Sequence, residues 1–253
     1  MTDVTAPLDR DDSAGPVDPL DPVALVVAAG ARVAAAGISP GSSGNVSVAH
    51  GDRVYATGTG TDLGRLRRED IAVLDREGRH LQGPKASKET SLHLAFYRKN
   101  PLHTAVVHVH SPQAVALSCL EPWSELSAVP PLTPYFVMRV GQTPMIPFRT
   151  PGSPELGELV LELDFPFHAA LLANHGQITS ATDVTRAVEA AVELEEACRI
   201  ALLTGGHPRR MLPEADIRSL SEKWGTPWAA SPADAGTPPV SSAASTPALR
   251  SAL

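Results

Sequence analysis

Three histidines end two apolar stretches of this chain. His108 and His110 close the run "TAVVHVH", and His175 closes the run "LLANHG". Side chains two positions apart on a strand project from the same face, so His108 and His110 can hold one metal ion. Imidazole suits zinc, manganese, iron or nickel, and a catalytic site is expected to have three protein ligands and one open position. Histidines that face water at a strand end are the alternative, but His175 stands where a strand meets a loop, and this favours the metal.

Glu89 stands near the start of an expected helix over residues 87–99, "SKETSLHLAFYRK". A carboxylate in the first turn is stabilised by the helix dipole by about 0.3–1 kcal/mol, and it needs no further role. Beside a divalent cation, the same carboxylate can act as a general acid or base. The spacing leaves both interpretations open. His93 follows one helical turn later and can either support Glu89 or pack in the core.

Three short polar loops have the composition of an anion-binding site. The candidate residues are Gly44 and Asn45 in "GSSGNVS", Thr59 and Gly60 in "TGTGTD", and Ser87 and Lys88 before the expected helix. Backbone N–H groups freed in such loops and at helix N-termini bind phosphate, and a lysine adds an ammonium group. Each loop alone is a weak signal, because Gly/Ser-rich loops are usually just turns. The GxGxxG and GxxxxGK[ST] spacings are absent, which disfavours a nicotinamide or nucleotide enzyme.

The composition is that of an ordinary globular protein. The chain has 253 residues, of which 43% are hydrophobic and 19% charged, with a formal net charge of −7. This charge argues against general binding to nucleic acid or an anionic membrane. No apolar run reaches the ~18 residues of a membrane span, and the N-terminus lacks the basic start of a signal peptide, so we expect a cytoplasmic protein. Cys119 and Cys198 have no framework spacing and are expected to be small buried residues.

The secondary structure expected from the pattern alternates irregularly between strands and helices. Helices are expected at 21–36, 87–99, 111–120, 154–164, 183–203 and 213–224, hairpins at 44–58 and 70–83, and strands at 104–110, 136–141, 145–148 and 169–176. This order favours one α/β or α+β domain, residues 20–228, around a largely antiparallel central sheet. Residues 1–19 and the Pro/Ala/Ser-rich residues 229–253 are expected to be disordered extensions. The histidines in the expected loops, among them His103 and His168, are expected to be solvated.

Several of these stretches, taken in order, resemble the class II aldolase/adducin family, typified by fuculose-1-phosphate aldolase. They are "SSGNVS", "ATGTGTDLGRL", "KASKETSLHLAFYR", "HTAVVHVHSPQAVALSCL" and "LLANHGQI", which lie between residues 23 and 204. The resemblance implies zinc ligands at His108, His110 and His175, one ion per subunit, and a catalytic glutamate at Glu89. It implies phosphate-binding positions at Gly44, Asn45, Thr59, Gly60 and Ser87. It also implies a three-layer α/β/α domain and a cyclic homotetramer with active sites at subunit interfaces.

Two departures from the aldolases resemble the branch of 3-oxo-tetronate 4-phosphate decarboxylases. Lys88 stands where the aldolases have a second serine, and the segment 130–156, "PPLTPYFVMRVGQTPMIPFRTPGSPEL", differs from theirs. Within that segment, Tyr135 is the nearest match to an aldolase tyrosine that reaches a neighbouring subunit's site. The epimerase branch carries aspartate at the position of Glu89, and adducin-like binding members lose the metal histidines that this chain keeps.

The resemblance implies metal-dependent decarboxylation of a small phosphorylated sugar acid. Loss of CO2 from 3-oxo-tetronate 4-phosphate leaves the enediolate of dihydroxyacetone phosphate, and Glu89 would protonate its carbanion carbon. Lys88 would neutralise the substrate's phosphate or its carboxylate. The main alternative is an aldolase that cleaves a sugar phosphate through the same kind of enediolate. A non-catalytic adducin-like scaffold is a third and more remote alternative.

Overall fold

A computed structural model describes residues 21–39 and 41–229. The expected extension at residues 1–19 lies outside the described residues, and so does the expected tail at 229–253 apart from Ala229. Among the residues described, no helix is long and apolar enough to cross a membrane.

An eight-stranded mixed sheet with the strand order β4-β3-β2-β1-β5-β8-β7-β6 forms the centre of the fold. Its strands are β1 (Asn45–His50), β2 (Arg53–Thr57), β3 (Ile71–Asp75), β4 (His80–Gln82), β5 (Ala105–Val109), β6 (Met145–Ile146), β7 (Ala169–Leu172) and β8 (Gly176–Ala181). Every neighbouring pair is antiparallel except β6 and β7, which confirms the expected α/β class with a largely antiparallel sheet. Both expected hairpins, β1–β2 and β3–β4, are present.

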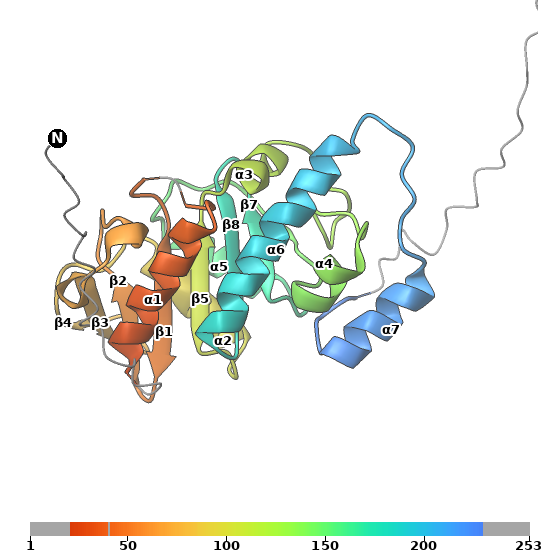
Figure 1. The fold of residues 1–253 in the computed structure, drawn as a ribbon. Coiled ribbons are helices and arrows are strands. Elements are labelled where there is room, and N and C mark those ends of the chain that lie inside the picture. Colours follow the sequence, from red (N-terminus) through yellow and green to blue (C-terminus); the bar gives the residue numbers. More distant parts are fainter. Residues whose placement is uncertain (1–20, 40, 230–253) are drawn as a thin grey trace, which may run out of the picture.

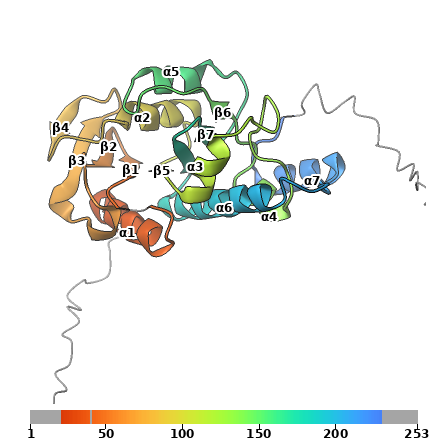
Figure 2. The same ribbon diagram turned by 90° about the horizontal axis from the view of Figure 1, so that it is seen from above.

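Helices cover both faces of this sheet (Figures 1 and 2). They are α1 (Pro22–Ala35), α2 (Thr90–Lys99), α3 (Pro112–Ser118), α4 (Pro134–Arg139), α5 (Glu155–Glu162), α6 (Val184–Leu203) and α7 (Glu214–Trp224), with two 3-10 turns, η1 (Leu63–Arg65) and η2 (Arg68–Asp70). Side chains of α1 and α6 share one apolar core with the sheet, and those of α2 and α5 share another. The central strands, buried on both faces, therefore reach solvent mainly at their ends.

Two expected elements differ from the structure, and one strand was not expected. Residues 136–141 were expected to be a strand, but they belong mostly to helix α4. Pro134 opens this helix at its first turn and Thr133 Oγ1 accepts the Phe136 N–H, so these capping signals outweigh the β-propensity of "FVM". Helix α2 begins at Thr90 rather than at residue 87. Strand β8, which directly follows the histidine turn, was not expected.

Two expectations about burial were wrong. Cys119 is exposed because it caps the C-terminal end of the short helix α3, whereas Cys198 is buried on α6 as expected. His103 is buried rather than solvated, and its ring lies edge to face with that of the partly buried His168, with 4.5 Å between centroids. His103 lies just before β5 and His168 just before β7, so the sheet brings the two loop residues together at one end of these strands.

Candidate active site

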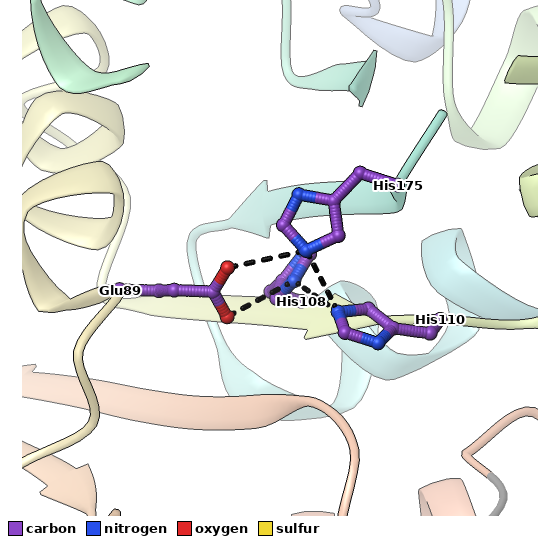
Figure 3. Close-up of side chains that lie close together, drawn as sticks. All are labelled: Glu89, His108, His110 and His175. Carbon is purple, nitrogen blue, oxygen red and sulfur yellow. Dashed lines mark hydrogen bonds and ion pairs between the residues drawn. The ribbon is translucent and has the colours of Figure 1, made fainter. Parts of the chain in front are cut away.

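Four side chains from three parts of the fold converge at one end of the central strands (Figure 3). His108 lies on β5, His110 directly follows that strand, and His175 lies in the turn between β7 and β8. Glu89 directly precedes helix α2. His110 Nε2 lies 3.0 Å from His108 Nε2 and 2.9 Å from His175 Nε2, and the Glu89 oxygens lie 3.2 Å from the other two of these nitrogens. The structure thus brings together residues separated by 86 positions along the chain (175 − 89).

The turn that carries His175 has an unusual backbone. Asn174 has φ 55°, a left-handed conformation that costs a non-glycine residue energy but that asparagine adopts more readily than most. Its N–H donates to the Ser118 carbonyl at 3.0 Å, which ties the turn to the end of α3. On the other side of His175, a Cβ added to Gly176 would lie 2.6 Å from the Val109 carbonyl oxygen. The tight turn and this close approach place His175 against the end of β5.

The donor set fits a divalent cation. His108 Nδ1 lies 2.8 Å from the Gln177 carbonyl oxygen, which can only accept, so Nδ1 carries the proton and the lone pair of Nε2 faces the other two histidines. Burial, followed by the charges of the neighbouring histidines, lowers the pKa of His110 to about 4, so this ring is neutral near pH 7. Three imidazole nitrogens and a carboxylate within 4.8 Å of one another match the ligand types of a zinc or similar site.

Glu89 is a buried carboxylate whose surroundings favour its ionised form. Only 8% of the residue is exposed. Burial alone would raise its pKa, but the contacts with His108, His175 and Asn45 outweigh burial and place the pKa well below the ordinary value. The Glu89 side chain makes no capping hydrogen bond to α2. A position at a helix start therefore explains the backbone of Glu89, whereas its side chain is directed into the cluster of histidines.

The candidate anion-binding loops lie around Glu89. The Thr59 N–H donates to the Lys85 carbonyl at 2.9 Å, and the Ser87 N–H donates to the Thr57 carbonyl at 3.0 Å, so the loop with Thr59 and Gly60 lies beside the loop with Ser87. Thr59 and Gly60 are both exposed. Gly44 has φ 90°, and an added Cβ would lie 2.7 Å from the His108 carbonyl oxygen, so only glycine fits beside strand β5.

Asn45, Lys88 and Tyr135 differ in how they relate to this cluster. Asn45 is buried, and its Nδ2 donates to Glu89 Oε2 at 2.9 Å, so its side chain serves Glu89 in this structure. Lys88 is exposed beside Glu89, and its Cβ would lie 2.8 Å from a Cβ added to Gly152. Tyr135 is 55% exposed on α4, where Arg139 lies over its ring, and it is outside the four-residue cluster.

A second hydrogen-bond network, not expected from the sequence, holds the segment that follows strand β5. Gln177 Nε2 donates to Ser111 Oγ at 2.7 Å, and Ser111 Oγ donates to Glu195 Oε2 at 2.6 Å. The Glu195 carboxylate also accepts the N–H groups of Gln113 and Ala114, both at 2.9 Å. It therefore fixes the chain directly after His110. The available signal was a carboxylate on the apolar face of α6, one turn after a buried alanine and one turn before Cys198.

Comparison with known proteins agrees with this arrangement. Residues 24–202 match the family described as "Class II Aldolase and Adducin N-terminal domain". A 3-oxo-tetronate 4-phosphate decarboxylase of Haemophilus influenzae is 41% identical over 200 residues, which are 79% of this chain and 95% of the relative. An L-fuculose phosphate aldolase of Methanocaldococcus jannaschii is 34% identical over 163 residues, which are 64% of this chain and 86% of the relative.

A solved structure supports the fold. The crystal structure of YgbL from Klebsiella pneumoniae, for which aldolase, epimerase and decarboxylase activities have been suggested, superposes with a TM-score of 0.74 and 34% identity. The match covers 79% of this chain and 97% of that chain. The family match at residues 24–202 spans every strand of the sheet that carries the four converging side chains.

Proposed function

The chain belongs to the class II aldolase and adducin family, and from this premise we propose that it decarboxylates a 3-oxo-tetronate 4-phosphate to dihydroxyacetone phosphate. The observation that carries this proposal is the convergence of Glu89 with His108, His110 and His175 in a chain whose decarboxylase relatives are 34–41% identical over most of its length. The protein is thus a carbon–carbon lyase, and specifically a carboxy-lyase.

The reaction breaks one bond and consumes one proton. The C1–C2 bond of the substrate breaks, C1 leaves as CO2, and its electron pair forms an enediolate across C2 and C3. A proton added to C2 then gives dihydroxyacetone phosphate. Because Glu89 rests in its ionised form, it takes up a proton before it delivers that proton to C2 from a carboxyl oxygen.

His108, His110 and His175 would hold the divalent cation, and we infer Zn²⁺ at one ion per subunit because three imidazoles suit a catalytic zinc site. When bound, the cation would supply positive charge beside the substrate oxygens on which negative charge develops. Gly44, Thr59, Gly60 and Ser87 would bind the phosphate, Thr59 and Ser87 through their hydroxyl groups because their N–H groups already donate to backbone carbonyls. Lys88 would neutralise one of the two anionic ends of the substrate.

The assembly and the layering also belong to this proposal. Helices on both faces of the sheet support a three-layer α/β/α domain. We propose a cytoplasmic homotetramer in which Tyr135, exposed on α4, reaches the site of a neighbouring subunit. Aldolase relatives favour one alternative, a lyase that cleaves fuculose or rhamnulose 1-phosphate. A non-catalytic adducin-like scaffold would not need four converging metal-binding side chains.

Product analysis tests the proposal. Purified protein is incubated separately with the 3-oxo-tetronate 4-phosphates derived from erythronate and threonate, and with fuculose and rhamnulose 1-phosphate. The proposal expects CO2 and dihydroxyacetone phosphate from one of the first pair. An aldehyde released from the sugar phosphates, with no CO2 from either oxo acid, would assign the chain to the aldolases. No turnover of any of the four compounds by metal-loaded protein would overturn both assignments.

A further inference from the structure

A chain of hydrogen bonds runs from Glu89 into the core, away from the metal-binding histidines. Asn45 Nδ2 lies 2.9 Å from Glu89 Oε2, and Asn45 Oδ1 lies 2.6 Å from His93 Nε2. At the other side of the imidazole, His93 Nδ1 lies 2.7 Å from Ser47 Oγ, which lies 2.8 Å from the Tyr97 hydroxyl. None of these five residues is more than 8% exposed, so water does not readily replace a missing partner.

The hydrogen-bond chain forms because strand β1 and helix α2 face each other and carry polar side chains at a similar spacing. Asn45 and Ser47 alternate on β1, so both point to the face covered by α2. Glu89 directly before α2, and His93 and Tyr97 on it, are four residues apart and form one stripe that faces β1. The two rows of polar side chains interlock.

The donor and acceptor of every hydrogen bond in this row can be assigned by starting at the Glu89 carboxylate. A carboxylate oxygen only accepts, so Asn45 donates with Nδ2 and turns its Oδ1 towards His93. Because Oδ1 only accepts, His93 Nε2 carries the proton. In a neutral imidazole Nδ1 is then an acceptor, so Ser47 donates to it, and Tyr97 donates to Ser47. Each group has a defined role, and none is left with two donors or two acceptors facing each other.

The ring of His93 stays neutral, as this assignment requires. Burial, together with the nearby His108, lowers the pKa of His93 to about 3, although Glu89 acts in the opposite direction. Burial also raises the pKa of Tyr97, so that its hydroxyl keeps the proton it donates.

We propose that His93 is a positioning residue that holds the Asn45 amide in the orientation that presents its N–H to Glu89. This inference rests on the proposed role of Glu89 as the acid and base of the reaction. Without the His93 proton, the Asn45 amide can rotate by half a turn and place its oxygen against the carboxylate. The side chain of Asn45 is then a part of the acid–base machinery, and only its backbone remains for the phosphate.

A graded pair of substitutions tests this role. His93→Leu keeps the size of the side chain but removes the donor, and we expect it to lower kcat about 10- to 100-fold with KM changed less than about 3-fold. His93→Gln retains an amide donor near the position of Nε2, and kcat should return to within about 3-fold of the unmodified protein. If His93 were purely structural, both variants would fill the space of its side chain. The loss of kcat would then be equal in the two variants, or larger in His93→Gln.

The chain offers a matched control at the other end of the same sheet. His103 is also a buried histidine, 8% exposed, whose Nδ1 contacts a serine hydroxyl. His103→Leu should change kcat less than about 3-fold, since His103 has no contact with Asn45 or Glu89. Metal content and thermal melting of all variants are measured in parallel. If His103→Leu lowers kcat as much as His93→Leu does, the effect is general and the proposal is overturned.

A measurement without substrate separates this inference from the proposed reaction. In protein labelled with 15N at histidine, the His93 ring should show a protonated Nε2 and an unprotonated Nδ1, and Ser47→Ala should shift the Nδ1 signal. This pattern would support the hydrogen-bond chain even if no decarboxylation were found. A protonated Nδ1, or activity that is the same in His93→Leu and the unmodified protein, would overturn the positioning role while leaving the reaction in place.

Discussion

Strands β5 and β7 have histidines beyond both of their ends, but the two ends of the sheet use them differently. At one end, the proposed metal end, His108 and His110 meet His175, and at the other end His103 meets His168. The two groups share the same strands, similar burial and the same residue type. Their difference therefore lies in how the ring nitrogens are paired.

The nitrogens at the metal end point at one another. His108 Nδ1 is engaged by a backbone carbonyl, so its Nε2 lone pair faces the Nε2 of His110 at 3.0 Å. Lone pairs this close repel unless a cation or a proton lies between them. Glu89 brings negative charge to the same point, which is the combination that attracts a divalent metal.

At the opposite end, the Ser180 hydroxyl connects the two histidines through conventional hydrogen bonds. Ser180 Oγ donates to the His168 carbonyl at 3.1 Å, and it accepts from His103 Nδ1 at 2.8 Å. The rings of His103 and His168 stack edge to face, and no carboxylate joins them in a ligand cluster among the described residues. A buried pair of histidines is therefore not by itself a metal site, and the third imidazole and the carboxylate decide the chemistry.

The largest expected difference between the two ends is in metal binding. His110→Ala should remove one of three imidazoles, so the purified protein should contain far less than one metal ion per chain and show no detectable turnover. His103→Ala should keep both the metal and the activity. Elemental analysis together with the CO2 assay checks this. Equal metal contents in the two variants would contradict the distinction between the ends.

The next largest effect is expected at Glu89. Glu89→Gln keeps the shape of the side chain but removes its acid–base capacity, so kcat should fall about 100- to 10,000-fold. Metal content should stay near one ion per chain, since the three histidines remain. Kinetic assays on protein of measured metal content test both parts. Nearly full activity in this variant would remove Glu89 from the mechanism.

A smaller effect on stability is expected behind the metal end. Glu195→Ala leaves Ser111 Oγ and two N–H groups of α3 without their acceptor, and we expect the free energy of unfolding to fall by about 2 kcal/mol. Glu196→Ala, on the same helix, removes only an exposed pair with Arg199 and should cost less than about 0.5 kcal/mol. Urea unfolding of both variants measures the difference, and equal losses would refute the special role of Glu195.

The smallest effect concerns the opposite end and its response to pH. Burial lowers the pKa of both His103 and His168 to about 4, from an ordinary value of 6.5. Below about pH 6.5 the unfolded chain binds protons that the folded protein rejects, so the stabilisation present above that pH is lost as the pH falls towards 4.

Replacing both residues by glutamine should reduce the loss of unfolding free energy between pH 7.5 and pH 5 by about 1 kcal/mol. This is less than the full pKa shifts would give, because solvent partly screens the rings. The free energy of unfolding, measured in urea at pH 7.5 and at pH 5 for both proteins, tests this. An unchanged pH dependence would show that the rings at this end titrate freely in the folded state.

Much of the site was visible in the sequence, and the missing parts have a common cause. The strand period placed His108 and His110 on one face, and the family resemblance joined them to His175 and Glu89. The roles of Gln177 and Glu195 were not visible, because a polar residue on a buried face shows that it has a partner but not which one. The strand expected at 136–141 failed because a threonine cap and a proline start a helix there regardless of β-propensity.

Residue identities and short repeats were enough to predict the ligand types, the family and the alternation of strands and helices. Which histidines share a point in space and which merely stack became clear only from the packing of the sheet. The same packing also decided that the Asn45 side chain faces Glu89 and His93. The physical reason is that hydrogen-bond direction and metal affinity depend on distances of a few ångströms between elements far apart in the chain, and these distances arise only when the sheet and its helices pack together.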